Sequence, residues 1–370
     1  MKKNPRIIIS GGGTGGHIFP AISIANALKK ICPETEILFV GAKDRMEMQR
    51  VPQAGYNIVG LPVRGLIRPL WSPRNISILI DFVKSKWEVK KVIKDFKPDV
   101  AVGVGGYASA ATLNAAYDLG IPCLIQEQNS FAGLTNKTLA KKACKICVAY
   151  EGMERFFPAN RILLTGNPVR QDLSNPSLDK ETALNEFGFH ANKPTILLIG
   201  GSLGARTLNN SVLHALKDIR NSNVQFIWQT GSYYKDHIAH ELEKHGIPEN
   251  LHVTDFIRSM NMAYKAADLV ISRAGASSIS EICLLGKPSI LVPSPNVSED
   301  HQTHNAMALV NKDAALIVKD AEAEETLIQL TINTVKDKNI LETLGKNAQK
   351  MALLNSDTKI AEEILQLIKK

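Results

Sequence analysis

The sequence has few cysteines and no long hydrophobic run, and both absences limit the class of protein. There are five cysteines in 370 residues. Because their number is odd and no cleavable signal precedes them, we expect reduced thiols and a cytosolic protein. No apolar run is long enough to span a bilayer. Cys144-x-x-Cys147 is the only close pair, and without a second pair or a suitably spaced histidine it favours a structural role over a metal site.

A glycine loop near the start of the chain is the most informative stretch. Ile7 to Ile9 is β-branched and apolar on both faces, as in a buried parallel strand. Gly11-Gly12-Gly13-Thr14-Gly15-Gly16 follows, and apolar residues then recur at helical spacing from Ile18, with Pro20 suited to a first helical turn. Such a strand, loop and helix start present N–H groups and a helix dipole to an anion, usually phosphate.

Two common phosphate motifs lack an essential residue here. A dinucleotide site needs an acid at the end of the second strand, but Ile37 to Val40 is followed by Gly41-Ala42-Lys43. A P-loop needs Lys and then Ser or Thr after its last glycine, but His17 follows Gly16. The remaining interpretation is a loop that lets a diphosphate or a sugar acceptor approach the backbone. The alternative, a tight turn without a ligand, does not require so many glycines, which cost conformational entropy.

Length and charge indicate two different halves. A chain of 370 residues suggests two domains, and 44% apolar and 22% charged residues are ordinary for a globular protein. Residues 1–170 contain 24 Lys/Arg and 12 Asp/Glu, whereas the rest contains 20 and 24. This asymmetry predicts an anionic surface or partner for the first half only.

Both halves alternate apolar strands with helical stretches, which predicts parallel α/β sheets. The second half restarts the plan with the strand Thr195 to Ile199 and the glycine loop Gly200-Gly201-Ser202-Leu203-Gly204-Ala205. We therefore predict two doubly wound, Rossmann-like domains, residues 1–170 and 171–354, with a cleft between their strand ends. Residues 355–370 form a terminal helix able to pack back on the first domain.

Three polar residues that follow the ends of predicted strands are candidates for binding a nucleotide. Glu281 could accept hydrogen bonds from both hydroxyls of a ribose, or Ser278-x-x-Glu281 could be a capping box. Arg170 could pair with a phosphate or form a surface salt bridge. Ser202 could donate to a phosphate or cap its helix.

His17 lies at the mouth of the first glycine loop. Its side chain titrates near neutrality, so it could act as a general base. Orienting the loop and binding a phosphate are the alternatives. His301-x-x-His304 has no third metal ligand, and we interpret His301 as a loop or cap residue. No Asp-x-Asp pair is placed to hold a divalent ion, so we expect neither a metal nor a cofactor.

A long helix is predicted over residues 76–96, and its apolar residues occupy two stripes. Those at core spacing are Leu79, Phe82, Val83, Val89, Ile93 and Phe96. A neighbouring stripe of Ile76, Ile80 and Trp87 is flanked by Lys84 and Lys91. An apolar stripe edged with lysine suits the surface of an anionic membrane. A broad core face with solvated lysines is the alternative.

Taken together, the motifs resemble the MurG family, whose members transfer N-acetylglucosamine in peptidoglycan synthesis. The resemblance extends over nearly the whole chain. The matching stretches are Gly11-Gly12-Gly13-Thr14-Gly15-Gly16-His17-Ile18-Phe19-Pro20-Ala21, Gly105-Gly106-Tyr107, Glu127-Gln128-Asn129, Ala132-Gly133-Leu134-Thr135-Asn136, Gly166-Asn167-Pro168-Val169-Arg170, Gly200-Gly201-Ser202, Ser272-Arg273-Ala274-Gly275-Ala276, Ser280-Glu281 and Gln302 to Asn305.

The resemblance implies the GT-B architecture, two Rossmann-like domains facing a central cleft, with the sugar nucleotide held by the second. It implies that UDP-N-acetylglucosamine contacts Thr14, Gly15, Gly16, Asn129, Arg170, Ser202, Ile257, Ala276, Ser277, Ser278, Ile279, Ser280, Glu281 and Gln302. Glu281 would hold the ribose and the Ile257 backbone would meet the uracil. Some members have Gln-Gln where this chain has His301-Gln302, and Leu203 replaces a frequent Gln. Any sugar contact at those two positions therefore stays open.

The implied reaction is inverting. The C4 hydroxyl of undecaprenyl-pyrophosphoryl-MurNAc-pentapeptide (lipid I) attacks C1 of N-acetylglucosamine, giving lipid II and UDP. His17 is the candidate base, and the enzyme is peripheral at the cytoplasmic face of the bacterial inner membrane. The partners are UDP-N-acetylglucosamine, lipid I and an anionic membrane surface, without nucleic acid. A UDP-N-acetylglucosamine 2-epimerase and a non-catalytic, membrane-docked sugar-nucleotide-binding subunit are the alternatives.

Overall fold

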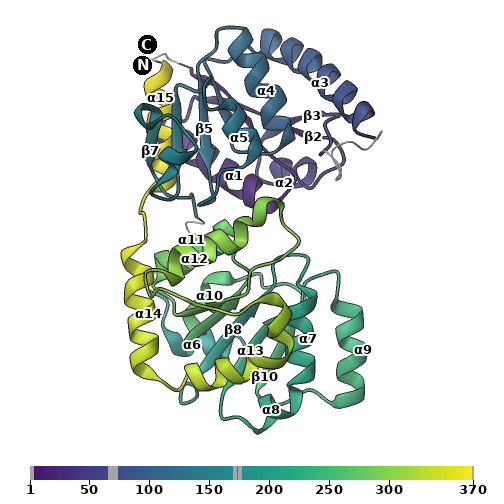
Figure 1. Ribbon diagram of the computed structural model, residues 1–370, viewed down its shortest axis with the longest axis vertical. Helices are drawn as coiled ribbons and strands as arrows, with labels where there is room; N and C mark the ends of the chain where they lie inside the picture. Colours follow the sequence, from purple (N-terminus) through teal and green to yellow (C-terminus); the bar gives the residue numbers. More distant parts are fainter. Residues whose placement is uncertain (1–3, 66–73, 170–172, 174–176, 369–370) are drawn as a thin grey trace. The chain divides into compact units, whose positions relative to one another are not determined.

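The computed structural model describes residues 4–65, 74–169, 173 and 177–368. The chain forms two compact units (Figure 1). Unit 1 comprises Met1–Val169 together with Leu353–Lys370, and unit 2 comprises Arg170–Ala352. Both units are built on parallel sheets, so the prediction of two doubly wound α/β domains is confirmed.

Unit 1 contains a seven-stranded parallel sheet in the order β3-β2-β1-β4-β5-β6-β7. An interior strand, β1, is buried on both faces: Ile8 faces one layer of helices while Ile7 and Ile9 face the other. This alternation is why the strand is apolar on both faces. The strands are β1 (Arg6–Ser10), β2 (Glu36–Ala42), β3 (Asn57–Leu61), β4 (Val100–Gly103), β5 (Cys123–Glu127), β6 (Lys145–Val148) and β7 (Ile162–Leu164).

Helices cover both faces of this sheet. On one face α3 and α4 contribute Val89, Ile93, Ala111 and Leu113 to a core with Ile8. On the other face α1 packs beside α15, whose Ile360 and Ile364 are fully buried. The end of the chain thus completes the core of unit 1. The helices are α1 (Gly15–Ile31), α2 (Glu47–Gln53), α3 (Arg74–Phe96), α4 (Tyr107–Asp118), α5 (Leu134–Leu139) and α15 (Ser356–Ile368), with 3-10 turns η1 (Met153–Arg155) and η2 (Ala159–Arg161).

Unit 2 contains a six-stranded parallel sheet in the order β10-β9-β8-β11-β12-β13. Its core includes the fully buried Trp228, whose indole N–H donates to Asn209 Oδ1 at 3.0 Å. The strands are β8 (Thr195–Ile199), β9 (Gln225–Gln229), β10 (Leu251–Thr254), β11 (Leu269–Ser272), β12 (Ser289–Leu291) and β13 (Leu316–Ile317).

The helices of unit 2 surround this sheet. Residues of α7, α9 and α13 join one core with the strands. The elements are α6 (Lys180–Asn185), α7 (Arg206–His214), α8 (Leu216–Asn221), α9 (Lys235–His245), α10 (Met260–Ala266), α11 (Ala276–Leu285), η4 (Ser298–Asp300), α12 (His301–Val310), α13 (Asp320–Thr334) and α14 (Lys338–Lys350).

Three details differ from the sequence predictions. Helix α1 begins at Gly15, so Pro20 lies inside it and not in its first turn. Strands β6 and β13 are not predicted, and β13 has only two residues, too few for a periodic pattern. Val83 is 57% exposed and lies on the same side of α3 as the exposed Ile80 and Trp87, not in the core.

Candidate functional site

The glycine loops after β1 and β4 lie against each other at the carboxyl edge of the first sheet. A Cβ on Gly106 would come within 2.6 Å of the Gly12 carbonyl oxygen. One on Gly105, whose φ is +102°, would come within 2.7 Å of His17 Nε2. These two glycines are therefore required for the close approach of the loops and of the imidazole ring.

His17 is the third residue of α1, and its ring is fixed by the loop. Nδ1 lies 3.0 Å from the Gly12 carbonyl oxygen and 3.5 Å from the Thr14 hydroxyl. A carbonyl oxygen only accepts hydrogen bonds, so the contact with Gly12 places a proton on Nδ1. Nε2 is then the basic nitrogen, and it lies beside Gly105.

Glu47, which belongs to no recognisable motif, lies beneath the first glycine loop. Its carboxylate is fully buried and accepts hydrogen bonds from the N–H groups of Gly13, at 3.1 and 3.2 Å, and Ala42, at 3.0 Å. A Cβ on Gly12 would lie 2.1 Å from Glu47 Oε1. Gly12 is thus needed to admit the chain's own carboxylate. The sequence signal is an acid in the first turn of a helix, which is too common to identify such a role.

Asn129 follows β5 and is held by a neighbouring carboxylate. Its backbone N–H and its side-chain amide donate to Glu127 Oε1, at 3.1 and 3.2 Å. Glu127 also accepts from Gly133 N–H and Asn136 Nδ2, and it is buried. Because all strands of unit 1 are parallel, Asn129, Thr14, Gly15 and Gly16 follow strands at the same edge of the sheet.

The second glycine loop, after β8, is braced by a neutral side chain. Gln229, the last residue of β9, accepts from Gly200 N–H at 3.2 Å and donates to the carbonyls of Gly201 at 2.9 Å and Asp255 at 3.1 Å. Ser202 is exposed in this loop. Helix α7 begins at Arg206 with Ala205 as its N-cap, so the alternative of Ser202 as a cap is wrong.

Glu281 lies in α11, which follows β11 in the middle of the second sheet. Its Oε2 accepts a hydrogen bond from the Tyr264 hydroxyl at 2.9 Å, and both side chains are buried. Gly275 is the N-cap of α11, and Ser278 lies inside the first turn. The capping-box alternative is therefore wrong, because Ser278 does not occupy the N-cap position. Tyr264 has no motif around it in the sequence.

The other predicted residues of α11 lie in its first turns, from Ala276 to Ser280. Ser280 donates its hydroxyl to the Ala276 carbonyl at 2.9 Å. Ala276 and Ile279 are buried, whereas Ser277 and Ser278 are half-buried. The helix start, together with Glu281, faces the same edge as the second glycine loop because β8 and β11 are parallel neighbours.

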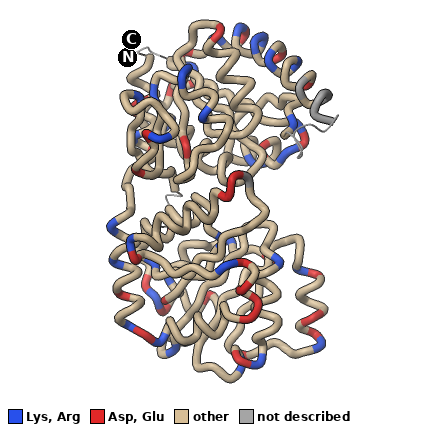
Figure 2. The backbone as a smooth tube through the Cα atoms, viewed as in Figure 1, with Lys and Arg blue, Asp and Glu red and all other residues tan. Residues whose placement is uncertain are grey.

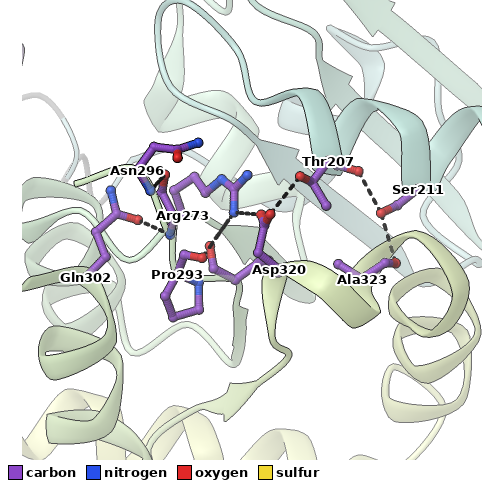
Figure 3. A network of polar contacts seen from close by, with 10 residues as sticks. Thr207, Ser211, Arg273, Pro293, Asn296, Gln302, Asp320 and Ala323 are labelled. Carbon is purple, nitrogen blue, oxygen red and sulfur yellow. Dashed lines mark hydrogen bonds and ion pairs between the residues drawn. The ribbon is translucent and has the colours of Figure 1, made fainter. Parts of the chain in front are cut away.

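Gln302 and the half-buried Arg273 hold the loop after β12 (Figure 3). Gln302 Oε1 accepts from Ser294 N–H at 2.8 Å. The Arg273 guanidinium donates to the carbonyls of Val292 and Pro293 and pairs with Asp320, whose other oxygen accepts from the Thr207 hydroxyl. The network thus ties the loops after β11 and β12 to α7 and α13.

Four predicted positions remain: Ile257, Arg170, Ile76 and His301. Ile257 is buried just after β10. Arg170 lies outside the described residues, and so does the side chain of Ile76. His301 is the first residue of α12, with Asp300 as its N-cap, so it is neither a loop nor a cap residue.

The surface of α3 combines apolar and basic side chains. Ile80 is 51% exposed and Trp87 is 76% exposed. Lys84 and Lys91 are also exposed, and Figure 2 shows the basic residues along this helix. None of the helices in the described ranges is long and apolar enough to cross a membrane.

The described part of the chain holds no cluster of three His, Cys, Asp or Glu side chains suited to a metal ion. In the Cys144-x-x-Cys147 pair, Cys144 is exposed and Cys147 is buried. Burial raises the pKa of the Cys147 thiol to about 12, as is usual for an unreactive structural cysteine.

Comparisons with known proteins agree with this geometry. Residues 7–148 match the glycosyltransferase family 28 N-terminal domain, and residues 195–364 match the C-terminal domain of that family. The chain is 60% identical to a Phocaeicola vulgatus protein named UDP-N-acetylglucosamine–N-acetylmuramyl-(pentapeptide) pyrophosphoryl-undecaprenol N-acetylglucosamine transferase, over 100% of this chain and 98% of that protein.

Solved structures give the same answer at the level of fold. MurG from Acinetobacter baumannii superimposes with a TM-score of 0.77 at 29% identity, over 98% of this chain and 99% of that one. A UDP-GlcNAc 2-epimerase from Neisseria meningitidis, with a TM-score of 0.68 at 14% identity over 98% of this chain and 100% of that one, shares the fold alone. The chain belongs to the MurG family of glycosyltransferases, with the GT-B type of fold.

Proposed function

We propose that this protein transfers N-acetylglucosamine from UDP-N-acetylglucosamine to the C4 hydroxyl of lipid I, yielding lipid II and UDP. The observation that carries this proposal is the 60% identity, over the whole chain, to a transferase named for that reaction. The order and spacing of the site residues in both units support it.

Unit 2 binds the donor. Glu281, held by the Tyr264 hydroxyl, accepts hydrogen bonds from the ribose, and the Ile257 backbone meets the uracil. The start of α7 and the exposed Ser202 hydroxyl face the diphosphate, where a helix N-terminus favours negative charge. Arg170 adds a positive charge, and Gln302 and Asn129 contact the sugar.

Unit 1 supplies the base. His17 Nε2 takes the proton of the acceptor C4 hydroxyl while that oxygen forms its bond to C1 of the sugar. The bond from C1 to the diphosphate oxygen breaks with inversion, and UDP leaves with the electron pair. N–H groups, the helix dipole and Arg170 stabilise the charge that develops on UDP.

The exposed stripe of α3 meets the cytoplasmic face of the inner membrane, where the lipid-linked acceptor resides. Apolar insertion of Ile80, Val83 and Trp87 adds to the attraction of Lys84 and Lys91 for anionic lipids. A polybasic, partly apolar helix of this kind binds a surface without crossing it.

The test measures UDP release from UDP-N-acetylglucosamine, with and without a lipid I analogue, in metal-free buffer. We expect release only with the acceptor. Release or sugar isomerisation without the acceptor would favour the epimerase. Tight UDP binding with no turnover under either condition would favour a non-catalytic binding subunit.

A further inference from the structure

The buried carboxylate of Glu47 is connected to the imidazole of His17 through one peptide group. The Gly13 N–H donates to Glu47 at 3.1 and 3.2 Å, and the Gly12 carbonyl oxygen lies 3.0 Å from His17 Nδ1. That N–H and that carbonyl are the two ends of the Gly12–Gly13 peptide. Carboxylate, peptide and imidazole therefore form a continuous chain of hydrogen bonds.

We propose that Glu47 is a positioning residue for the base, acting on His17 through the Gly12–Gly13 peptide. This inference rests on the proposed role of His17. A carboxylate on the N–H side polarises a peptide and makes its carbonyl oxygen a stronger acceptor. The Gly12 oxygen then holds the proton on Nδ1 and stabilises the imidazolium that forms when Nε2 takes a proton. No proton passes through the peptide.

The residues around Glu47 leave space for its side chain and hold its carboxylate in place. A Cβ on Gly12 would lie 2.1 Å from its Oε1, and one on Gly41 would lie 2.6 Å from its Cγ. Its third hydrogen bond, from Ala42 N–H at 3.0 Å, fixes the carboxylate at the end of β2. The carboxylate is fully buried, so solvent does not screen its effect on the peptide.

The arrangement serves the same purpose as the aspartate of a serine-protease triad, which holds a histidine tautomer and stabilises the imidazolium. Here a peptide group stands between the acid and the ring. An acid in direct contact with the ring gives the larger effect, so we expect a smaller one from Glu47 than from a triad aspartate.

The first experiment compares acceptor-dependent UDP release by the wild type, Glu47→Gln, His17→Ala and the double variant. Glu34→Gln is the control, because Glu34 is an exposed carboxylate of the same unit. We expect Glu47→Gln to lower kcat about tenfold, the scale of a hydrogen bond to a charged group, with the KM for UDP-N-acetylglucosamine unchanged. Glu47→Asp, which keeps the charge, should recover part of the rate, and the control should match the wild type.

The double variant separates positioning from general stability. If Glu47 acts through His17, Glu47→Gln has little further effect once His17 is alanine. An equal loss with and without His17 would overturn the inference and leave Glu47 a purely structural residue. Full activity of His17→Ala would instead overturn the base assignment, and absence of acceptor-dependent release by the wild type would overturn the proposed function.

A second measurement needs no variant of Glu47. The ¹⁵N shifts of labelled histidine, with His17 assigned by its loss in His17→Ala, report the tautomer of the neutral ring in the wild-type protein. We expect the proton on Nδ1. A proton on Nε2 would contradict the contact with the Gly12 carbonyl and overturn the inference even if Glu47→Gln does not fold.

Discussion

The two glycine loops of this protein occupy equivalent places but bind side chains of different charge. Each follows an interior strand, β1 or β8, and precedes a helix, α1 or α7. The neighbouring strand, β2 or β9, leads to the side chain that accepts from the loop. In unit 1 this is the carboxylate of Glu47, and in unit 2 it is the carboxamide of Gln229.

The difference shows why similar sequences can serve different ligands. A loop that already holds a buried carboxylate disfavours a second anion beside it, since like charges at short distance repel strongly away from water. A neutral amide orients the backbone without adding charge. The second loop is therefore the better site for a diphosphate, and the first is suited to a neutral hydroxyl and its base.

The largest effect is expected when the proposed base beside the first glycine loop is removed. His17→Ala should lower kcat for acceptor-dependent UDP release by about a hundredfold or more, the usual range for loss of a general base. The KM for UDP-N-acetylglucosamine should change little, because we propose that the donor is bound by unit 2. Steady-state rates over a range of donor concentrations provide the measurement, and a kcat within threefold of the wild type would exclude the base role.

The next largest effect is expected when a carboxylate is placed beside the second loop, as in the first. Gln229→Glu should weaken UDP binding by about thirtyfold, because the new oxygen faces the carbonyls of Gly201 and Asp255 and adds charge near the diphosphate. Calorimetric titration with UDP measures it. Gln225→Glu is the matched control, a buried amide at the opposite end of the same strand. We expect it to lower thermal stability but to leave UDP affinity unchanged, and an equal loss of affinity would contradict the role of charge.

A smaller effect tests how unit 2 holds the nucleotide. Tyr264→Phe removes the hydroxyl that donates to Glu281, and we expect the KM for UDP-N-acetylglucosamine to rise about tenfold with kcat nearly constant. Steady-state kinetics measure both constants. Tyr56→Phe, which removes an exposed hydroxyl bonded to Asn26 in unit 1, is the control. A fall in kcat alone would mean that the pair acts on the transition state and not on binding.

The smallest effect is expected when exposed apolar residues on the two units are compared for their contribution to membrane binding. Trp87→Ser should reduce binding to vesicles that contain anionic lipid by about fivefold, because it removes part of the exposed apolar area that we propose inserts into the membrane interface. Co-sedimentation with the vesicles measures it. Ile247→Ser, a change at an exposed apolar residue of unit 2, should have no effect. Equal losses of vesicle binding in the two variants would show that the α3 surface is not a specific membrane-binding site.

The fold was predictable because its signals are local. Strands such as Ile7 to Ile9 are apolar on both faces, and only a sheet covered on two sides buries both. Glycine loops and apolar helices follow these strands in both halves, so the alternation alone predicts parallel α/β sheets. Strand β13 was not predictable, because pairing with β12, and not its own two residues, defines it.

The site was predictable at the residues that motifs contain and not at those that support them. His17 and Glu281 lie in recognisable stretches that follow strand ends. Glu47, Tyr264 and Gln229 do not, because each reaches its partner from another element through tertiary packing. Val83 was assigned to the wrong side of α3 for a related reason, since adjacent stripes on a helix differ only in what packs against them.

The sequence alone determined the two-unit parallel architecture, the positions of both glycine loops and the charge difference between the halves. These features depend on periodicity, composition and short motifs, which act within a few residues. Only the tertiary structure decided which side chain fills each glycine loop, and therefore which loop carries a built-in charge. That choice depends on segments that lie far apart in the chain and meet only when the parallel strands bring their carboxyl ends to one edge.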